Sequence, residues 1–541
     1  MPQIQYTKEG GTIRWDKDDW LAGLHPQHQY DTTGVLKSYP SQNLYNESVT
    51  PFRELGALFP GYLPEAATNN SQVTSILLNA VVNNTDAYFV SSGAKVHKIT
   101  NITYPLSLET TSWAHTITLG GGHAAHSSVA GEDIVLYNCN VGGIRQRCMF
   151  VSWNDNTDWD VAQYTFATAS TVWDDDFMST ASASPLASPY LTGGKGYPHP
   201  MIVGDDDILY IGSSNYVHAY DGATGANGTF YPAVLTLPAG FVVKSFAKIE
   251  NYLIVFAYYN NTNSSYLGQA KAYFWNYLDL DPTKVVDLDD NKVCAAFQYG
   301  ATVGCITAGN YQSGNSQSKP FRLRIWNGAE FKTVANFGGE EPINGGVQVI
   351  EGSILINTGT KVFQYGSTLL KPVINELFQP HSNTGSSAGL LKQIWTDTLV
   401  SSSGTTSSGG LELLNNDKYD SGSAMLPWAL PQFPRGKRGR LKNISVRFHS
   451  TVTASANKFQ LQIQTEQLQL KDVINSGDNV ISASTETMIR EYTTLQNGDP
   501  FPVFTAITPI LTWAVNDSTK TECLAVEEVT AEFEFINYTV T

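Results

Sequence analysis

Short apolar runs separated by polar turns make up the middle of the chain. In "DDDILYIGSSNYVHAYDGATG" (Asp205–Gly225), two apolar runs flank a turn of Ser and Asn, and a second turn follows at Asp221-Gly222. No run of a dozen residues carries a clean 3.6-residue apolar period, whereas β-branched and aromatic residues fill the short runs. This pattern predicts an all-β protein built from hairpins.

The same hairpin is written three times. "DILYIGSSNYVHAYD" (Asp207–Asp221) aligns without a gap with "DAYFVSSGAKVHKIT" (Asp86–Thr100) and "GSILINTGTKVFQYG" (Gly352–Gly366). Each copy has an apolar strand, a turn of Ser, Thr, Gly or Asn, and a second strand. Self-similarity at a long period is the signature of a repeat architecture.

Looser copies lie between these three. They begin at "EDIVLYN", "NYLIVFAYY" and "TVGCITAG", so that the six copies start at residues 86, 133, 207, 251, 302 and 352. Four of the five steps between them measure 44 to 51 residues, close to the length of a four-stranded propeller blade. The longer step holds "ATASTVWDDDFMSTASASPLASPYLTGGKG", which we expect to form a surface loop.

One further apolar run precedes each copy, as in "SILLNAV", "HSSVAG", "HPMIVG" and "FAKIE". In a propeller this run would be the innermost strand, lining the central channel. The runs of the following strands are apolar on both faces, as expected where blades pack face to face. The sequence therefore favours a six-bladed β-propeller, with seven blades as the alternative.

The pattern divides the chain into four parts. Residues 1–70 are expected to be an extended N-terminal arm, with Gly11–Trp15 closing the ring as the outer strand of the last blade; residues 71–375 are the propeller. Residues 376–435 are either a linker or a degenerate extra blade, and "SSSGTTSSGG" (Ser401–Gly410) is flexible by composition. Cleaner alternation, as in "KFQLQIQTE", predicts a β-sandwich over residues 436–541.

Composition narrows the function. The 541-residue chain has a net charge of -16 and only 15% charged residues, which argues against a general nucleic-acid-binding surface. The amino terminus lacks the apolar core of a signal peptide, and no 18-residue apolar stretch could span a membrane. We expect synthesis in a cytoplasm and no membrane insertion. The five cysteines are then expected to be free buried thiols, although Cys139/Cys148 and Cys294/Cys305 could face each other across hairpins.

Three tryptophans are candidates for a glycan-binding platform, because aromatic faces stack on sugars. Trp153, Trp159 and Trp173 lie on or near the long insertion. The alternative is that they are aromatic residues of the core or of blade interfaces.

One basic cluster stands out in the acidic chain. It comprises Arg435, Lys437, Arg438 and Arg440, in "RGKRGR", and could contact a phosphate or an acidic partner. The alternative is a solubilising entry to the first strand of the sandwich.

Metal sites are weakly indicated. His123, His126 and His199 could meet at the channel mouth, but no carboxylate or thiol stands at a familiar ligand spacing. "NDNTDWD" (Asn154–Asp160) alternates oxygen ligands like a calcium loop but lacks its turn glycine and distal Glu, which favours a solvated turn. The acidic clusters at 174–176, 205–207 and 287–290 are expected to be loop residues. No metal or cofactor is expected.

Catalytic motifs are missing from the sequence. It contains no Gly-x-Ser-x-Gly elbow, no His-Glu-x-x-His and no phosphate loop, and it lacks the sialidase, WD40 and kelch repeat signatures. A catalytic triad whose members lie far apart in the sequence would leave no such motif. We expect a protein that is not an enzyme.

Three features resemble bacteriophage virion proteins of the tail nozzle and tail-hub type. These are "NESVTPFRELGALFPGYLPEAATN" before the first blade, the ring of degenerate blades, and "WALPQFPRGKRGRLKNISVRF" between propeller and sandwich. The resemblance implies a homo-oligomeric tail component that binds other virion proteins and surrounds the DNA path, with passive contact to viral DNA. An acidic lumen would repel DNA and let it slide.

Two other functions stay open. One is recognition of a host surface glycan by a tail protein, and the other is a glycan-cleaving propeller enzyme that uses paired carboxylates from the Asp clusters. The expected location is the virion tail.

Overall fold

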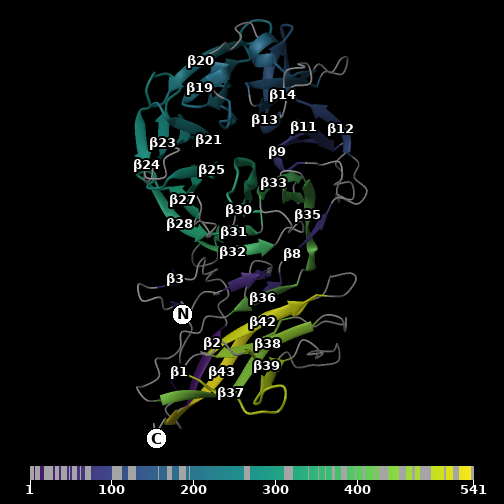
Figure 1. Ribbon diagram of the computed structural model, residues 1–541, viewed down its shortest axis with the longest axis vertical. Coiled ribbons are helices and arrows are strands. Elements are labelled where there is room, and N and C mark those ends of the chain that lie inside the picture. Colours follow the sequence, from purple (N-terminus) through teal and green to yellow (C-terminus); the bar gives the residue numbers. More distant parts are fainter. Residues whose placement is uncertain are drawn as a thin grey trace. The chain divides into compact units, whose positions relative to one another are not determined.

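The computed structural model is almost entirely β-structure (Figure 1). Its chain separates into two compact units. The ring unit comprises residues 65–360 and 380–414, and the terminal unit comprises residues 1–64, 361–379 and 415–541. The structure describes residues 5–6, 12–17, 29–30, 36–37, 45–47, 49–50, 58–60, 62–66, 75–99, 113–119, 129–155, 157–166, 173–181, 190–193, 195–260, 269–309, 321–338, 340–350, 352–359, 361–367, 372–378, 387–395, 398–405, 408–419, 421–425, 437–449, 458–465, 470–474, 489–504, 507–515 and 523–537.

Seven antiparallel four-stranded sheets follow one another along the described part of the chain. In the first six, four consecutive strands pair in chain order. Their strands are β9–β12 (Leu77–Asn83, Asp86–Ser91, Lys95–Ile99, Trp113–Thr118), β13–β16 (Ala130–Val141, Ile144–Asn154, Trp159–Thr165, Trp173–Asp174), β17–β20 (Met201–Val203, Leu209–Ser213, Tyr216–Asp221, Thr229–Thr236), β21–β24 (Phe241–Ile249, Tyr252–Tyr259, Ala270–Trp275, Lys284–Asp287), β25–β28 (Lys292–Tyr299, Thr302–Ala308, Phe321–Trp326, Phe331–Phe337) and β29–β32 (Val347–Ile350, Ser353–Asn357, Val362–Ser367, Pro372–Phe378).

The seventh sheet is built differently. Its order is β33-β34-β35-β8, with β33 (Ser387–Trp395), β34 (Thr398–Thr405) and β35 (Ser408–Tyr419) followed by β8 (Tyr62–Ala66) from far earlier in the chain. An early segment therefore does complete a sheet of the ring, but this segment is β8. The expectation for Gly11–Trp15 is wrong, because β2 (Thr12–Lys17) pairs with the last strand of the chain, β43 (Val526–Asn537).

The first strands of the seven sheets form a closed cycle. Each contacts the first strand of the next sheet, and β33 contacts β9. Figure 1 shows first strands such as β13, β21 and β25 around a common centre, with fourth strands such as β24 and β28 at the periphery. The arrangement is propeller-like, and the sheets pack through buried apolar faces such as the one shared by Phe150, Tyr220 and Phe177.

The hairpins read from the sequence are confirmed in the ring. Leu209 pairs with Tyr220 in one copy, and Ala87 pairs with Ile99 in another. The predicted strand position of the copy at residue 133 is wrong, however. "EDIVLYN" belongs to β13, which is the first strand of its sheet rather than the second. One long strand there takes the place of two short ones.

The Ser/Gly-rich segment is also different from the expectation. Residues 401–405 and 408–410 lie in the paired strands β34 and β35, and Ser401 and Ser402 are buried. A Cβ atom on Gly389 would lie 2.3 Å from the Ser402 carbonyl oxygen. Small residues permit this close approach of two backbones, so composition typical of a linker here serves packing.

Two antiparallel sheets and one core make up much of the terminal unit. One sheet has the order β1-β2-β43-β37-β40, and the other has β39-β38-β42-β36-β5. Phe448 and Phe459 meet across the core with ring centroids 5.2 Å apart, and Phe459 contacts Trp513 at 5.4 Å. The bounds are β1 (Gln5–Tyr6), β37 (Lys437–Phe448), β40 (Ile489–Tyr492), β39 (Leu470–Ile474), β38 (Lys458–Thr465), β42 (Ile507–Ala514), β36 (Gly422–Met425) and β5 (Tyr45–Glu47).

Candidate functional site

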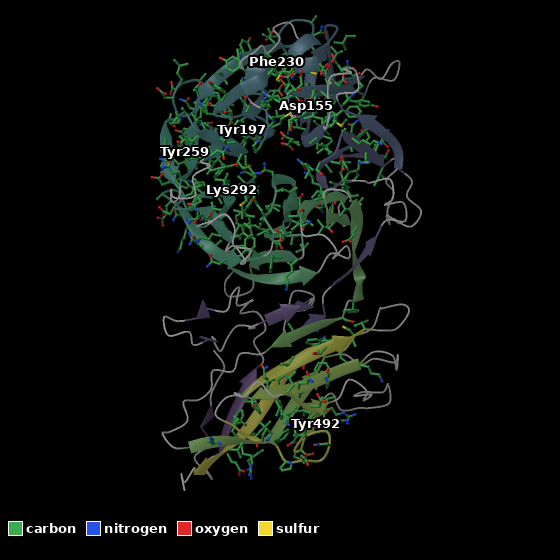
Figure 2. The ribbon with its side chains drawn as sticks, viewed as in Figure 1. Asp155, Tyr197, Phe230, Tyr259, Lys292 and Tyr492 are labelled. Atoms are coloured by element: carbon green, nitrogen blue, oxygen red, sulfur yellow. The ribbon has the colours of Figure 1, made fainter. Side chains whose placement is uncertain are left out.

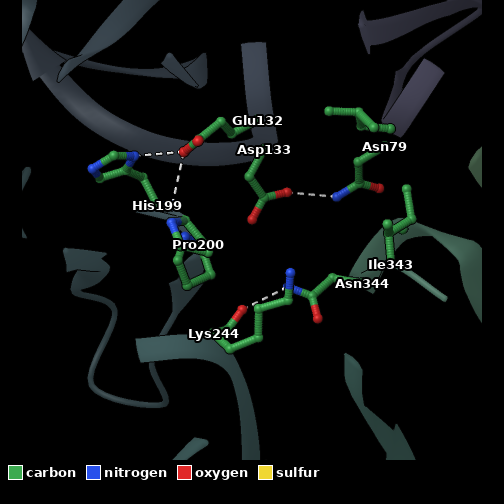
Figure 3. Close-up of a pocket in the computed structure, with 11 residues that line it drawn as sticks. Asn79, Glu132, Asp133, His199, Pro200, Lys244, Ile343 and Asn344 are labelled. Atoms are coloured by element: carbon green, nitrogen blue, oxygen red, sulfur yellow. Dashed lines mark hydrogen bonds and ion pairs between the residues drawn. The ribbon is translucent and has the colours of Figure 1, made fainter. Parts of the chain in front are cut away.

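A cavity of about 190 Å³ lies among the first strands of the ring unit. Its wall comes from β9, β13, the segment before β17, β21 and the short 3-10 helix η3 (Asn344–Gly346). Asp133 and Lys244 reach toward it from facing sides (Figure 3). The lining residues are Leu78, Asn79, Glu132, Asp133, Pro198, His199, Pro200, Lys244, Ile343, Asn344 and Gly345.

Asp133 is held by three hydrogen bonds. Its Oδ1 accepts from Asn79 Nδ2 at 2.7 Å and from the Ile134 amide at 2.9 Å, and its Oδ2 accepts from the Met201 amide at 2.8 Å. Burial raises the pKa of this carboxyl above its ordinary value, while the Met201 and Asn79 hydrogen bonds oppose the rise. The carboxyl is thus fixed at the cavity wall by its own strand and two neighbouring ones.

Glu132 is paired with His199. One carboxylate oxygen lies 2.5 Å from His199 Nδ1 and accepts from the His199 amide at 2.8 Å, and the other accepts from Asn154 Nδ2. The His199 ring stacks on Trp159 with centroids 4.1 Å apart and an interplanar angle of 17°. These contacts position Glu132 and leave it little freedom to turn.

Lys244 brings an amino group to the opposite wall. Burial lowers the pKa of its ammonium group, and the Glu341 carboxylate partly offsets this. Among the described residues, its Nζ has no hydrogen-bond or ion-pair partner. Its carbonyl oxygen accepts a hydrogen bond from Asn344 Nδ2 at 3.0 Å, while Asn344 Oδ1 is buried without a partner in the described structure.

Gly345 allows η3 to approach β9. A Cβ atom at this position would lie 2.0 Å from the Leu78 carbonyl oxygen, so a larger residue would force the segments apart. The glycine therefore sets the width of the cavity on this side.

Other lysines of the ring centre have acidic neighbours. Lys292, near the ring centre in Figure 2, binds Glu341 with an Nζ–Oε1 distance of 2.7 Å. Burial lowers the pKa of Lys392, and the charge of Asp133 raises it. Lys244 differs from Lys292 in having no such bond.

The tryptophans proposed as a glycan platform do not form one surface. Trp153 and Trp159 are 1% and 0% exposed, and their Nε1 atoms donate to the carbonyl oxygens of Asp175 and Tyr190 at 2.7 and 3.0 Å. Trp173 is half-buried and contacts Tyr164. Buried rings offer no face to a sugar from solvent. Trp153 and Trp159 are therefore aromatic residues of the core or of sheet interfaces, which was the alternative interpretation.

The basic cluster falls at the start of β37 in the terminal unit. Arg435 lies outside the described residues, and for Lys437 only the backbone strand is described. Arg438 is half-buried, and the exposed Arg440 lies 3.8 Å from Glu534. Contact with a phosphate or partner at this cluster stays a prediction.

The metal and calcium candidates have simple structural surroundings. His123 and His126 lie outside the described residues, and no cluster of metal-ligating side chains occurs among the residues that are described. Asp155 Oδ1 accepts from the amides of Thr157 and Asp158 at 2.6 and 2.7 Å, which closes the β14–β15 turn. The turn is confirmed, but Asp155 itself is buried rather than solvated. Within the described parts, no helix is long and apolar enough to cross a membrane.

Not all the acidic clusters are plain loop residues. Asp205 and Asp207 form ion pairs with Lys248 and Arg145 at the surface. Asp290 lies in the loop between β24 and β25, as expected, but it is 2% exposed and binds two arginines, so it does not stand free at a sheet edge.

Of the polar cavity residues, only His199 was predicted from the sequence, although a signal for the others was present. Lys244 interrupts the apolar run "FVVKSFA", and Glu132-Asp133 interrupt "VAGEDIVLY". A charge within an otherwise buried first strand must face something polar. Assigning "EDIVLYN" to a second strand hid this signal at Asp133.

Comparisons with known proteins give no family. No protein-family model matches the chain, and no curated protein matches it. Among solved structures, the chain is similar to the Dos1 propeller at 10% identity and a TM-score of 0.40, covering 65% of this chain and 94% of that one. It is similar to the computationally designed Ika8 protein at 9% identity and a TM-score of 0.36, covering 62% and 96%. It is also similar to an exo-beta-1,3-galactanase from Phanerochaete chrysosporium at 10% identity and a TM-score of 0.32, covering 87% and 100%. Scores this low carry no argument about function.

Proposed function

We propose that the chain is a structural component of a bacteriophage virion, a tail nozzle, hub or connector protein that assembles as a homo-oligomeric ring around the DNA path. In this proposal the seven four-stranded sheets are the blades of a seven-bladed β-propeller, and the two sheets that contain β37 and β38 are a β-sandwich. Its binding partners would be other virion proteins, with passive contact to viral DNA.

One observation carries the proposal: strands from early in the chain pair with strands from much later in it. β8 completes the seventh four-stranded sheet, and β2 pairs with β43, the last of the described strands. Early segments therefore belong to sheets formed mostly by much later segments. This pairing resists local unfolding, because the early strands can separate only if contacts between distant parts of the sequence break. Such a framework suits a component that must hold its shape in a particle. The chain is assigned to a virion because its arm and its bridging segment resemble those of tail proteins.

Peptide mass spectrometry across a density gradient of phage particles from the source tests the proposal. The expected result is a peak of this chain with the DNA-containing particles at a fixed, low copy number. A chain that stays in the soluble fractions would overturn it.

The second candidate is a tail protein that recognises a host glycan, and the cavity between Asp133 and Lys244 favours it. This candidate is tested by a different measurement from the first, namely whether a sugar binds the purified chain.

A further inference from the structure

The cavity at the ring centre is larger than a site for a bridging water. Its volume is about 190 Å³. A single water needs only about 10–15 Å³ of such space. The cavity therefore has room for a molecule of many heavy atoms.

Several polar groups at its wall have unused bonding capacity. A carboxylate can accept about four hydrogen bonds, and the described partners of Asp133 supply three. Lys244 Nζ has no described partner, and Asn344 Oδ1 is buried without one. The wall thus offers unused donors and unused acceptors together, which a molecule bearing hydroxyl groups satisfies because each hydroxyl donates and accepts.

The charges at the wall disfavour an ion. Carboxyl groups and the Lys244 amine share this small space, and burial disfavours the charged forms of both Asp133 and Lys244, so neither an anion nor a cation finds a matching set of opposite charges. Leu78, Ile343 and Pro200 add apolar surface between the polar groups. A neutral ring with a C–H face and hydroxyl edges matches this mixture.

We propose that the cavity binds one neutral pyranose unit, with Lys244 donating to ring hydroxyls and Asp133 and Asn344 accepting from them. The site is independent of a virion role: a chain that fails to enter particles can still bind a sugar, and a tail component can lack this site.

Saturation-transfer difference NMR on the purified full chain tests the site. The probes are the methyl pyranosides of glucose, galactose, mannose and N-acetylglucosamine, with glucuronate as the anionic probe. We expect transfer to at least one neutral pyranoside and weaker transfer to glucuronate. No transfer to any neutral pyranoside, or stronger transfer to glucuronate, would overturn the proposal.

Variants on one strand assign the site to the cavity. Lys244→Met keeps the side-chain length but removes the donors, so binding is expected to weaken roughly tenfold or more, as for a lost hydrogen bond to a charged group. Lys244→Gln retains donors and should keep part of the affinity. Lys248→Met is the matched control, because Lys248 lies on the same strand and binds Asp205 at 2.7 Å instead of lining the cavity. Equal binding by Lys244→Met and the control, with thermal unfolding showing both folded, would contradict the site.

A trisaccharide ending in the best-bound pyranose separates two sources of the sugar. Tighter binding than the methyl pyranoside supports the end of a glycan as ligand, and equal binding supports a free sugar.

Discussion

Asp290 lies in the loop before β25 and forms ion pairs with two arginines of β27. Its Oδ2 is 2.9 Å from Arg324 Nη2, and its other oxygen binds Arg322. Thr307 hydroxyl joins the same carboxylate, and Arg324 Nε donates to Thr307 Oγ1 at 3.1 Å. Because Asp290 and Arg324 are both buried, removing one charge leaves the other without compensation in a medium of low polarity.

Asp290→Asn is therefore expected to lower the free energy of unfolding by about 3 kcal/mol, the usual cost of breaking a buried ion pair. Asp287→Asn is the control, since the Asp287 side chain is 70% exposed in its pair with Lys271 and should change stability little. Urea unfolding of both variants measures this. Similar losses in the two variants would contradict the role assigned to burial.

Asp160 gives stability a dependence on pH. Burial raises the pKa of its carboxyl from 3.8 to about 8, although the amides of Val161 and Met178 donate to it at 2.6 and 3.0 Å. Between these two values the folded state holds a proton that the unfolded state has released. Raising the pH through this window therefore lowers stability, by up to about 1.4 kcal/mol per pH unit from this group.

Asp160→Asn removes this titration and is expected to flatten the decline between about pH 5 and about pH 7. Unfolding in urea at several pH values compares the slopes, with Asp158→Asn as the control in the same turn. A variant slope equal to that of the unaltered chain would contradict the raised pKa.

At the scale of elements, pairing partners decide what local pattern cannot. The hairpin at Asp207–Asp221 is readable because its two strands and turn are adjacent in sequence. β8 and β2 carry no sign of their partners, since Tyr62–Ala66 joins a strand more than 300 residues later and Thr12–Lys17 joins β43. Strand pairing over such separations depends on the whole fold rather than on local propensity.

Ile13→Pro tests the pairing of β2. Ile13 is opposite Phe533 on one side and Tyr6 on the other, so its N–H faces a paired strand whichever side it points to. Proline removes that donor, and inside a sheet it is tolerated essentially only at edges and bulges, so β2 is expected to lose its pairing. Hydrogen exchange read by mass spectrometry should show lost protection in 526–537 and unchanged protection in 201–260. Lost protection in the ring strands instead would restore the rejected assignment of Gly11–Trp15.

At the scale of the molecule, the all-β class and the repeated hairpins were predictable, but the cavity was not. The repeated hairpins in the sequence predict that similar sheets exist. The cavity depends on which first strands of those sheets face each other, and the repeats do not give this. Lys244 and Asp133 are 111 residues apart in sequence and meet only because the ring closes. Closure itself rests on β33 contacting β9 and on β8 completing the seventh sheet.

The cavity depends on closure of the ring, and electron cryomicroscopy of the purified full chain tests whether the ring closes. A map that resolves strands should show seven four-stranded blades around one axis, with β8 as the outer strand of the seventh. Six blades, or a seventh sheet without β8, would contradict the closed ring and with it the cavity at its centre.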